Sequence, residues 1–524
     1  MKITLISITT TQDQGIRTLS SILKKENYEV NLVFMGYQEG YYNLYRKDIL
    51  EQLKNICKDS ELIGVNCFVS TKFRAVQIIR YLRKELKTTI VFGGIHVTIA
   101  PTECIKDNSI LCLGEAEEAI VDIANAIKNK KPLNKIKNLW IRKENEIIKN
   151  PVRDLVGNLD KLPYPDYDLK NHYILDGNRI RKFQERDIGR EILFLSGRGC
   201  PYACDYCSNS TFNELYKCSQ KKIPRHHSVE YIIGFLKQIK SKFKNVNYVG
   251  LRDDTFTMRD IGQISEFCKK YKKEIGLNFF ISADARTISE DKVKLLVDAG
   301  CVDVNLGIQG SERVNKEVYH RYIDNASILK AAIIFNKYKD KVCVHYDLIS
   351  TSPYDTEQDI LDVITFVKKL PKPFALGLNN LTFFIGSKLY NRAVRDGIIK
   401  SFKDTGNTLE HGDRSGHILL KKKNIYLNTI LNLMRGSVIE KKYGDLSERQ
   451  LDLLLNKTLI KIFNDGNPLV YIFPYSLKFF DFIKYNIAMR IYSKMPYSIK
   501  EWLVRRKYSG KIHYSDINIR QGEK

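Results

Sequence analysis

Long apolar runs are missing from this sequence of 524 residues. No stretch of about 18 or more uninterrupted apolar residues occurs, so the sequence predicts no membrane-spanning helix. The opening segment MKITLISITTTQDQG holds too short an apolar run for a secretory signal. The 11 cysteines are odd in number and irregularly spaced, which argues against a disulfide framework. These absences favour a cytoplasmic protein in a reducing compartment.

A long basic tail is also absent, although the formal net charge is +25. The excess positive charge is spread over scattered lysines. It is compatible with a nucleic-acid partner, an anionic membrane surface or an acidic substrate, but a lysine-rich solvated surface explains it equally well. The charge alone therefore selects no partner. The length predicts two or three domains.

Apolar strand segments alternate with helical segments through the first 133 residues. Strands are expected over residues 3–8, 29–35, 61–68, 88–94 and 109–114. Continuous apolar strands between helices indicate a parallel sheet that is covered on both faces. We therefore predict a five-stranded, doubly wound α/β domain, Rossmann-like and of the flavodoxin type, over residues 1–133.

The turns at the carboxyl ends of these strands are candidate ligand contacts, because ligands of doubly wound sheets bind there. The candidates are Ser70, Thr71, Gly93, Gly94, His96, Gly114 and Glu115. Paired glycines let a bulky ligand approach the backbone closely. Ordinary turn chemistry is the alternative for each turn, and His96 on its own would fit a packing or capping role.

Residues 134–188 are expected to form a hairpin and a linker. The segment 136–149 fits a hairpin with its turn at residues 143–145. The sequence LDKLPYPDYDL follows, and its two prolines disfavour a regular helix or a central strand. We expect this segment to cross from one domain to the next.

The alternation resumes over residues 189–395. Apolar strands are expected over residues 191–196, 247–254, 277–284, 302–309, 342–350 and 375–384, which predicts a partial (β/α)6 barrel of the TIM type. Barrel enzymes place their catalytic groups at the carboxyl ends of the strands. The polar residues near these ends are Asp253, Asp254, Ser282, Asp284, Arg286, Gln309, Ser311, His345, Asp347, Asn379 and Asn380. We therefore expect these side chains to converge on one mouth of the barrel.

Three cysteines lie in the loop GRGCPYACDYCS, which follows the first barrel strand: Cys200, Cys204 and Cys207. Thiolates are the usual ligands of iron–sulfur clusters, but a ferredoxin run supplies four of them. Cys218 lies too far along the chain to be a local fourth ligand. A zinc site with His226 and His227, a redox C-x-x-C pair and chance clustering are the alternatives. The barrel context favours a cluster with one iron that the protein does not bind.

The loop resembles the C-x3-C-x-aromatic-C cluster motif of the radical S-adenosylmethionine (radical SAM) enzymes, with Tyr206 as the aromatic residue. The segments GLRDDTF, DART, LGIQGSERVN and DLISTSPYDTEQD are similar to the same superfamily, so the resemblance covers residues 190–390. It implies a 4Fe-4S cluster on the three cysteines, with S-adenosylmethionine on the open iron. One electron then yields methionine and a 5′-deoxyadenosyl radical, which abstracts a hydrogen atom from the substrate.

The resemblance also assigns contacts to S-adenosylmethionine. Asp253 and Asp254 would hold its amino group, Arg286 its carboxylate, and Gln309 its ribose or its amine. A guanidinium fork suits a planar anion such as a carboxylate. After the fifth barrel strand, relatives commonly show G-x-P-G, whereas this chain has STSPYDT.

The N-terminal segments FGGIHVT and LGEAEEA and the linker resemble the cobalamin-binding members of the superfamily, which implies cobalamin as a further cofactor. The D-x-H-x-x-G motif of the methionine-synthase type is absent. The corresponding loop reads TTTQDQGIRT, so cobalt would receive no histidine from it.

The resemblance implies a methyltransferase that acts on an unactivated carbon or phosphorus centre of a small-molecule or lipid-like substrate. An external one-electron donor of the flavodoxin or ferredoxin type would reduce the cluster. Radical cyclisation or ring rearrangement without methyl transfer is one alternative. A tRNA-modifying methylthiotransferase is another, but it would need a second cysteine triad, so a nucleic-acid partner is not favoured. A non-catalytic iron–sulfur protein would not need polar residues at every strand end.

Residues 396–524 are expected to be mostly helical. The segment 475–494 fits a helix that packs on the barrel, and a peripheral helix on an anionic membrane is its alternative.

Overall fold

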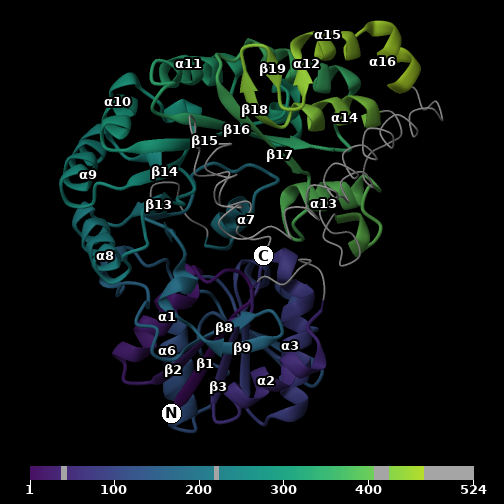
Figure 1. Cartoon of the computed structure of the whole chain (residues 1–524). Coiled ribbons are helices and arrows are strands. Elements are labelled where there is room, and N and C mark those ends of the chain that lie inside the picture. The colour runs from purple at the N-terminus through teal and green to yellow at the C-terminus, as the bar shows by residue number, and fades with distance from the viewer. Residues whose placement is uncertain (37–43, 217–222, 406–423, 465–524) are drawn as a thin grey trace.

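The computed structural model describes residues 1–36, 44–216, 223–405 and 424–464 (Figure 1). It shows a smaller N-terminal α/β unit below a larger one that curves over it (Figure 1). Within the described ranges, no helix is long and apolar enough to cross a membrane. The segment 475–494 lies outside the described residues.

The first unit is built on one nine-stranded sheet in the order β7-β6-β5-β4-β3-β1-β2-β8-β9. Its strands are β1 Lys2–Ser7, β2 Glu29–Phe34, β3 Leu62–Asn66, β4 Thr89–Gly93, β5 Ile110–Cys112, β6 Leu139–Lys143, β7 Glu146–Lys149, β8 His172–Asp176 and β9 Arg179–Lys182. The five predicted strands form its parallel centre, in the flavodoxin-type order β5-β4-β3-β1-β2. The doubly wound prediction is therefore confirmed.

Helices cover both faces of this sheet. They are α1 Gln14–Lys25, α2 Lys47–Cys57, α3 Lys72–Glu85, α4 Ile95–Ile99, α5 Pro101–Cys104 and α6 Glu117–Lys128. Apolar side chains of α1 and α6 join one hydrophobic cluster, and those of α2 and α3 join another. Strands that are buried on both faces need apolar residues throughout, which explains their continuous apolar sequence.

The segment between the two units extends the first sheet at both edges. The expected hairpin forms β6 and β7, which pair antiparallel to each other. A second hairpin, β8 and β9, joins the other edge beside β2, and the sequence did not indicate it. The prolines keep residues 159–169 out of the sheet, and β8 begins just beyond them at His172.

The second unit contains the six predicted barrel strands, all parallel and paired in chain order. They are β10 Glu191–Phe194, β13 Tyr248–Leu251, β14 Asn278–Ala283, β15 Cys301–Gln309, β16 Cys343–Ser350 and β17 Phe374–Asn380. The helices of this unit that precede residue 396 are α7 Ser208–Leu215, α8 Val229–Lys242, α9 Ile261–Glu274, α10 Glu290–Asp298, α11 Asn325–Asn336, α12 Glu357–Lys369 and α13 Lys388–Arg395. Helices α8 to α12 form the outer arc of the barrel (Figure 1).

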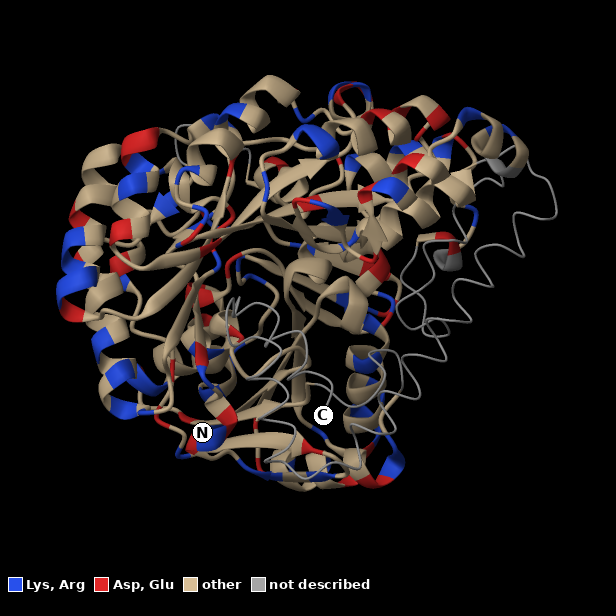
Figure 2. Ribbon diagram, turned by 45° about the horizontal axis from the view of Figure 1, so that its top comes forward, with Lys and Arg blue, Asp and Glu red and all other residues tan. Residues whose placement is uncertain are grey.

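The described part of the C-terminal region completes the second sheet. Its helices are α14 Ile425–Met434, α15 Glu448–Leu454 and α16 Lys457–Asn464. Three short antiparallel strands, which the sequence did not indicate, extend the sheet beyond β17: β18 Gly436–Ile439, β19 Lys442–Tyr443 and β20 Leu446–Ser447. Figure 2 shows basic and acidic residues interspersed along the outer helices, as expected for a solvated surface.

Two glutamines of the first unit cover the edge strand β10 of the second. Gln12 donates from Nε2 to the carbonyl of Glu191 (2.6 Å) and accepts from the N–H of Leu193 (2.6 Å). Gln14 accepts from the N–H of Leu195 (2.5 Å) and donates to its carbonyl (3.2 Å). Unpaired edge groups would otherwise be open to another strand. The loop TTTQDQG thus joins the two units at the open side of the barrel.

Candidate active site at the barrel mouth

The cysteine loop between β10 and α7 is anchored to distant parts of the barrel. The backbone N–H of Asp205 donates to the carbonyl of Tyr319 (2.9 Å), and the carbonyl of Asp205 accepts from the N–H of Leu389 (3.0 Å). The Asp205 carboxylate lies 2.6 Å from Nδ1 of His320. The ring of Tyr206 packs edge-on against Tyr319, with 5.0 Å between centroids. These contacts attach the loop to the segment that follows β15 and to the start of α13.

The three loop thiols fit a polynuclear metal centre. Burial raises the pKa of Cys200 to about 12 and that of Cys207 to about 11. A cationic centre would therefore have to displace their protons on binding. Three sulfur donors from one loop fit an iron–sulfur cluster with one iron that the protein does not bind.

A single zinc ion fits these thiols poorly. Tetrahedral zinc with Zn–S bonds of about 2.3 Å places its sulfurs about 3.8 Å apart. Among the described residues, the groups whose ligand atoms all lie within 4.8 Å do not include the cysteine loop. His227 is occupied elsewhere, because its Nδ1 contacts Asp160 Oδ1 at 3.0 Å and its ring stacks on Tyr231. Burial lowers the pKa of His226 to about 4, which keeps its ring neutral at pH 7, but His226 forms no metal-ligand group with the thiols among the described residues. Cys218 lies outside the described residues.

Asp253 at the end of β13 is occupied by structural donors. It is 3% exposed and accepts hydrogen bonds from the backbone N–H groups of Ser196 and Gly197 (2.6 and 2.9 Å). Its Oδ2 also pairs with Nη1 of Arg259 at 2.8 Å. Asp253 therefore holds the start of the cysteine loop, and its carboxylate is not open to a ligand as the sequence suggested.

Asp254 is open to the mouth. It accepts hydrogen bonds from the N–H of Gly199 (3.1 Å) and from Nδ2 of Asn209 (2.7 Å), which places it against the cysteine loop. Its side chain is exposed to solvent, yet the protein around it desolvates the carboxylate and raises its pKa. A carboxylate in this environment favours a cationic partner such as an ammonium group.

Arg286 is also occupied. Its Nε and Nη2 form a bidentate pair with Asp284 (2.7 and 2.7 Å), and its Nη1 donates to the carbonyl of Tyr322 (3.0 Å). Its guanidinium lies 3.5 Å from the ring centroid of Tyr202. The hydrogen bonds from Arg286 offset burial, so the pKa of Asp284 is lowered. The carboxylate contact expected for Arg286 would have to compete with this pair.

Arg321 is a second guanidinium at this mouth, and the sequence did not single it out. It is 5% exposed, and its Nη2 donates to the carbonyl of Gly307 (3.0 Å). Its Nη1 is buried and has no hydrogen-bond partner among the described residues. Arg321 lies near Gln309 at the end of β15, since a side chain at Gly307 would meet both. A buried donor without a protein partner is rare and requires an acceptor from water or a ligand.

Some of the cobalamin candidates at the edge of the first sheet are exposed, and others are buried and stabilise the turns. Ser70 is exposed after β3, and Gly93, the last residue of β4, is partly exposed. Thr71 is buried, and its Oγ1 accepts from the N–H of Phe68 (3.1 Å), so it serves the turn. Phe68 is 45% exposed beside Ser70 and is a further candidate that the sequence reasoning missed. An exposed phenylalanine offers an apolar contact for a large ring system.

His96 and Gly94 serve packing. His96 is fully buried, its Nε2 lies 3.6 Å from Glu103 Oε2, and burial lowers its pKa to about 4. Gly94 has φ of +103°, and a Cβ there would lie 2.6 Å from the carbonyl oxygen of Cys67. Close approach of the two neighbouring turns therefore explains this glycine. The ring nitrogens of His96 have no hydrogen-bond partner among the described residues, but the ring is fully buried and offers no open contact to cobalamin.

Glu115 binds the barrel. Its Oε1 contacts Nη2 of Arg225 (2.7 Å) and Nη1 of Arg198 (3.1 Å), and its Oε2 accepts from Nη1 of Arg225 (3.0 Å). Arg198 also contacts Glu117 at 2.6 Å. Although burial opposes it, the hydrogen bond from Arg225 lowers the pKa of Glu115. Glu115 is therefore a contact between the two units.

Two further contacts surround Glu115. Its backbone N–H donates to the hydroxyl of Tyr216 on the barrel side (2.6 Å), and a side chain at Gly114 would overlap that hydroxyl. The N–H of Val156 in the linker donates to Glu115 Oε2 (2.9 Å). Through Glu115, the turn after β5 contacts the cysteine loop at Arg198, two residues before Cys200.

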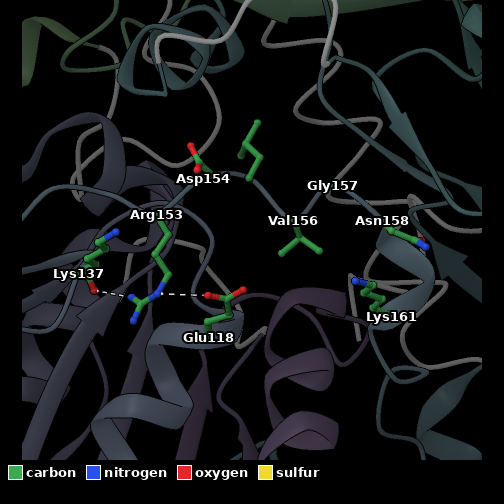
Figure 3. A pocket seen from close by; sticks show the side chains of 9 residues that line it. Glu118, Lys137, Arg153, Asp154, Val156, Gly157, Asn158 and Lys161 are labelled. Atoms are coloured by element: carbon green, nitrogen blue, oxygen red, sulfur yellow. Dashed lines mark hydrogen bonds and ion pairs between the residues drawn. The ribbon is translucent and has the colours of Figure 1, made fainter.

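A surface cavity of about 480 Å³ is lined in part by Val156 (Figure 3). Lys137, Arg153 and Lys161 contribute to its lining, and Arg153 is paired with Glu118 at 3.3 Å. This cavity contains none of the candidate residues at the barrel mouth. It therefore belongs to the linker.

Comparisons with known proteins agree with the two-unit architecture. The family model "Radical SAM superfamily" matches residues 194–367, and the model "B12 binding domain" matches residues 6–124. An uncharacterized methyltransferase of Pyrococcus horikoshii is 24% identical over 401 residues, which are 75% of this chain and 80% of that protein. Bacteriochlorophyllide d C-8(2)-methyltransferase of Chlorobaculum tepidum is 24% identical over 349 residues, covering 65% of this chain and 70% of that protein.

Other relatives carry different names. The anaerobic magnesium-protoporphyrin IX monomethyl ester cyclase of Rubrivivax gelatinosus is 23% identical over 320 residues, covering 57% of this chain and 53% of that protein. Among solved structures, the cobalamin-dependent S-adenosylmethionine radical enzyme OxsB, with aqua-cobalamin and S-adenosylmethionine bound, has a TM-score of 0.62 at 14% identity. That match covers 93% of this chain and 75% of OxsB, and it shows the shared fold.

A B12 binding domain in front of a radical SAM domain, with the cysteine loop at the barrel mouth, accounts for both units of the molecule. The cofactors of this family are a 4Fe-4S cluster, S-adenosylmethionine and cobalamin. The chain belongs to the cobalamin-dependent radical SAM enzymes.

Proposed function

We propose that the chain is a methyltransferase that acts on an unactivated carbon or phosphorus centre of a small-molecule or lipid-like substrate. The observation that carries this proposal is the junction at Glu115, which ties the turn after β5 of the B12 binding domain to Arg198 in the cysteine loop. A methyl carrier and a radical source must reach the same substrate atom, and this junction brings their two domains together.

The barrel mouth supplies groups for S-adenosylmethionine. Cys200, Cys204 and Cys207 would hold the cluster. Asp254 would bind the amino group, because its desolvated carboxylate lies against the cysteine loop. Arg321 would bind the carboxylate through its unpaired Nη1, and this role replaces the one expected for Arg286.

Three further residues support this arrangement. Gln309 would contact the ribose beside Arg321. Asp253 and Arg286 act indirectly, since Asp253 fixes the start of the cysteine loop and Arg286 stacks on Tyr202 within it. Tyr206 packs the loop against Tyr319.

The cofactors carry the chemistry, and the protein positions them. When bound, the cluster supplies the electron that cleaves S-adenosylmethionine, and cobalamin supplies the methyl group. An external one-electron donor of the flavodoxin or ferredoxin type would provide the electron. On the side of the B12 binding domain, Ser70 and Phe68 are the exposed groups that would face cobalamin.

The test uses the full chain, purified anaerobically, reconstituted with iron and sulfide and supplied with cobalamin. With a strong reductant and trideuteromethyl-labelled S-adenosylmethionine, we expect 5′-deoxyadenosine, and a product three mass units heavier than the protiomethyl product once a substrate-containing metabolite fraction is added. Cys204→Ala is the matched control and should form neither product. A wild-type protein with a full cluster that forms no 5′-deoxyadenosine would contradict the proposal.

Radical cyclisation or rearrangement is the second candidate, and the cyclase among the relatives favours it. The same assay separates the two functions. A new product that accumulates with 5′-deoxyadenosine but carries no deuterium from the methyl group would identify cyclisation or rearrangement.

A further inference from the structure

The inner wall of the barrel is polar along β15, β16 and β17. Residues of these strands alternate between buried and partly exposed, and the buried ones join the hydrophobic cluster beneath the outer helices. The partly exposed ones therefore face the barrel interior. On β16 these are His345, Asp347 and Ile349. A carboxylate thus faces the interior in the middle of the wall.

Asp347 has a glycine beside it on each neighbouring strand. The register pairs Asp347 with Gly307 on β15 and with Gly377 on β17. A side chain at Gly377 would overlap Oδ1 of Asp347, and one at Gly307 would overlap the amide of Gln309. The two glycines therefore make room for the Asp347 carboxylate and the Gln309 amide on the inner wall, next to the residues proposed to hold S-adenosylmethionine.

Two other charged groups of the inner wall, Arg252 and Asp303, have close polar or charged partners. Arg252 lies 3.5 Å from Glu191, and its guanidinium stacks 4.3 Å from the ring centroid of Phe280. Asp303 accepts from the hydroxyl of Tyr248 (2.7 Å) and lies 3.0 Å from Nε2 of His345. These contacts give both charged side chains partners within the wall.

Asp347 differs from them. Its Oδ2 accepts a hydrogen bond from Nδ2 of Asn305 at 3.2 Å, and no lysine or arginine of the described ranges forms an ion pair with it. Burial raises the pKa of Asp347, and the nearby His345 offsets this only in part. A cationic ligand would stabilise the ionised carboxylate and offset this desolvation.

We propose that Asp347 binds a protonated amine of the substrate, so that the enzyme acts on an amine-bearing small molecule whose reacting part lies beside Gln309 and Arg321. The assignment rests on the proposed function. A charge-assisted hydrogen bond to an ammonium group is stronger than one to a neutral hydroxyl. The alternative of a purely hydrocarbon chain in this row would leave the Asp347 carboxylate with the Asn305 amide but no cationic donor.

The test compares butylammonium with its isosteric alcohol, 1-butanol, on the cluster-loaded full chain saturated with S-adenosylmethionine. Ligand-observed NMR titration measures both dissociation constants. We expect butylammonium to bind about tenfold more tightly than 1-butanol. Asp347→Asn, which keeps the side-chain shape, should abolish this preference. Asp340→Asn, which removes an exposed carboxylate on the surface, is the matched control and should keep it.

The outcomes are distinct. Equal binding of the two probes by the wild type, tighter binding of 1-butanol, or a preference that survives Asp347→Asn would each overturn the amine assignment. Formation of 5′-deoxyadenosine in the same preparations tests the proposed function separately. Asp340→Asn should retain this activity, because Asp340 is an exposed carboxylate outside the barrel mouth.

Discussion

The ion-pair junction at Glu115 provides the sharpest test of how the two domains are joined. Glu115→Gln keeps the shape of the side chain but removes the charge that neutralises Arg225 and part of that of Arg198. The Glu115 side chain is 10% exposed and that of Arg225 is 8% exposed, so the pair is largely shielded from water. Breaking such a pair from one side costs about 3–5 kcal/mol.

The expected loss at this junction is smaller than that figure. Arg198 keeps its contact with Glu117 at 2.6 Å, and the new amide can still accept hydrogen bonds. We therefore expect a loss of about 2–3 kcal/mol, which corresponds to an about 30- to 150-fold larger equilibrium constant for opening of the interface.

Native-state hydrogen exchange measures this opening directly. The backbone amides of Glu115 and Val156 report on it, because they donate to Tyr216 and to the Glu115 carboxylate. Glu118→Gln is the matched control, since Glu118 is 73% exposed and pairs with Arg153 at 3.3 Å. An exposed pair is worth about 0–1 kcal/mol, so its loss should leave exchange at the junction unchanged. If Glu115→Gln and Glu118→Gln give equal exchange at these amides, the reasoning is refuted.

The junction also predicts a pH dependence. The folded-state pKa of Glu115 is lowered, because the hydrogen bond from Arg225 and the nearby positive charges outweigh burial. A lowered pKa contributes stability above the unfolded value of about 4.3, and that contribution is lost as pH falls through the lower folded-state pKa. The protection of the junction amides in the wild type, corrected for the intrinsic pH dependence of amide exchange, should therefore fall in acid, while Glu115→Gln should lack this step.

Further predictions concern the barrel mouth and its edge. Cys204→Ala should lose the visible absorbance of the reconstituted cluster and all cleavage of S-adenosylmethionine. Asp254→Asn should weaken binding of S-adenosylmethionine without lowering the melting temperature, whereas Asp253→Asn should lower it, because Arg259 loses a buried partner worth about 3–5 kcal/mol. Arg321→Lys should raise KM for S-adenosylmethionine about tenfold, because an ammonium group cannot keep the bond that Nη2 makes to the Gly307 carbonyl and also place a donor where Nη1 lies; an unchanged KM would return the carboxylate role to Arg286. Gln12→Ala should expose the edge of β10 and increase aggregation on mild heating, measured by light scattering, with exposed Gln358→Ala as the control.

Much of the architecture could be predicted because it depends on local periodicity. The five strands of the first domain and the six of the barrel are apolar runs between helices, and each run is a property of neighbouring residues. The strand ends follow from the runs, so Asp254 and Gln309 could be placed at the barrel mouth. The spacing of the three cysteines within one short loop likewise carries its chemical meaning without any distant partner.

The fate of individual polar residues could not be predicted in this way. Asp253 and Asp254 are neighbours in sequence, yet one is buried on Arg259 and the other faces the mouth. The second hairpin, β8 and β9, pairs with β2, which lies far earlier in the chain. Edge strands take their stability from a partner whose position only the folded chain defines.

The sequence by itself determined the fold class, the order of the two domains and the cluster motif, because these depend on short-range patterns of apolar residues and thiols. Only the tertiary structure assigned Glu115 to Arg225, 110 residues away, and Gln12 to the edge of β10, 179 residues away. It also placed Arg321 beside Gln309 and Asp347 between two glycines. The physical reason is that an ion pair or an open carboxylate depends on distances through space, and these are set when helices and strands pack.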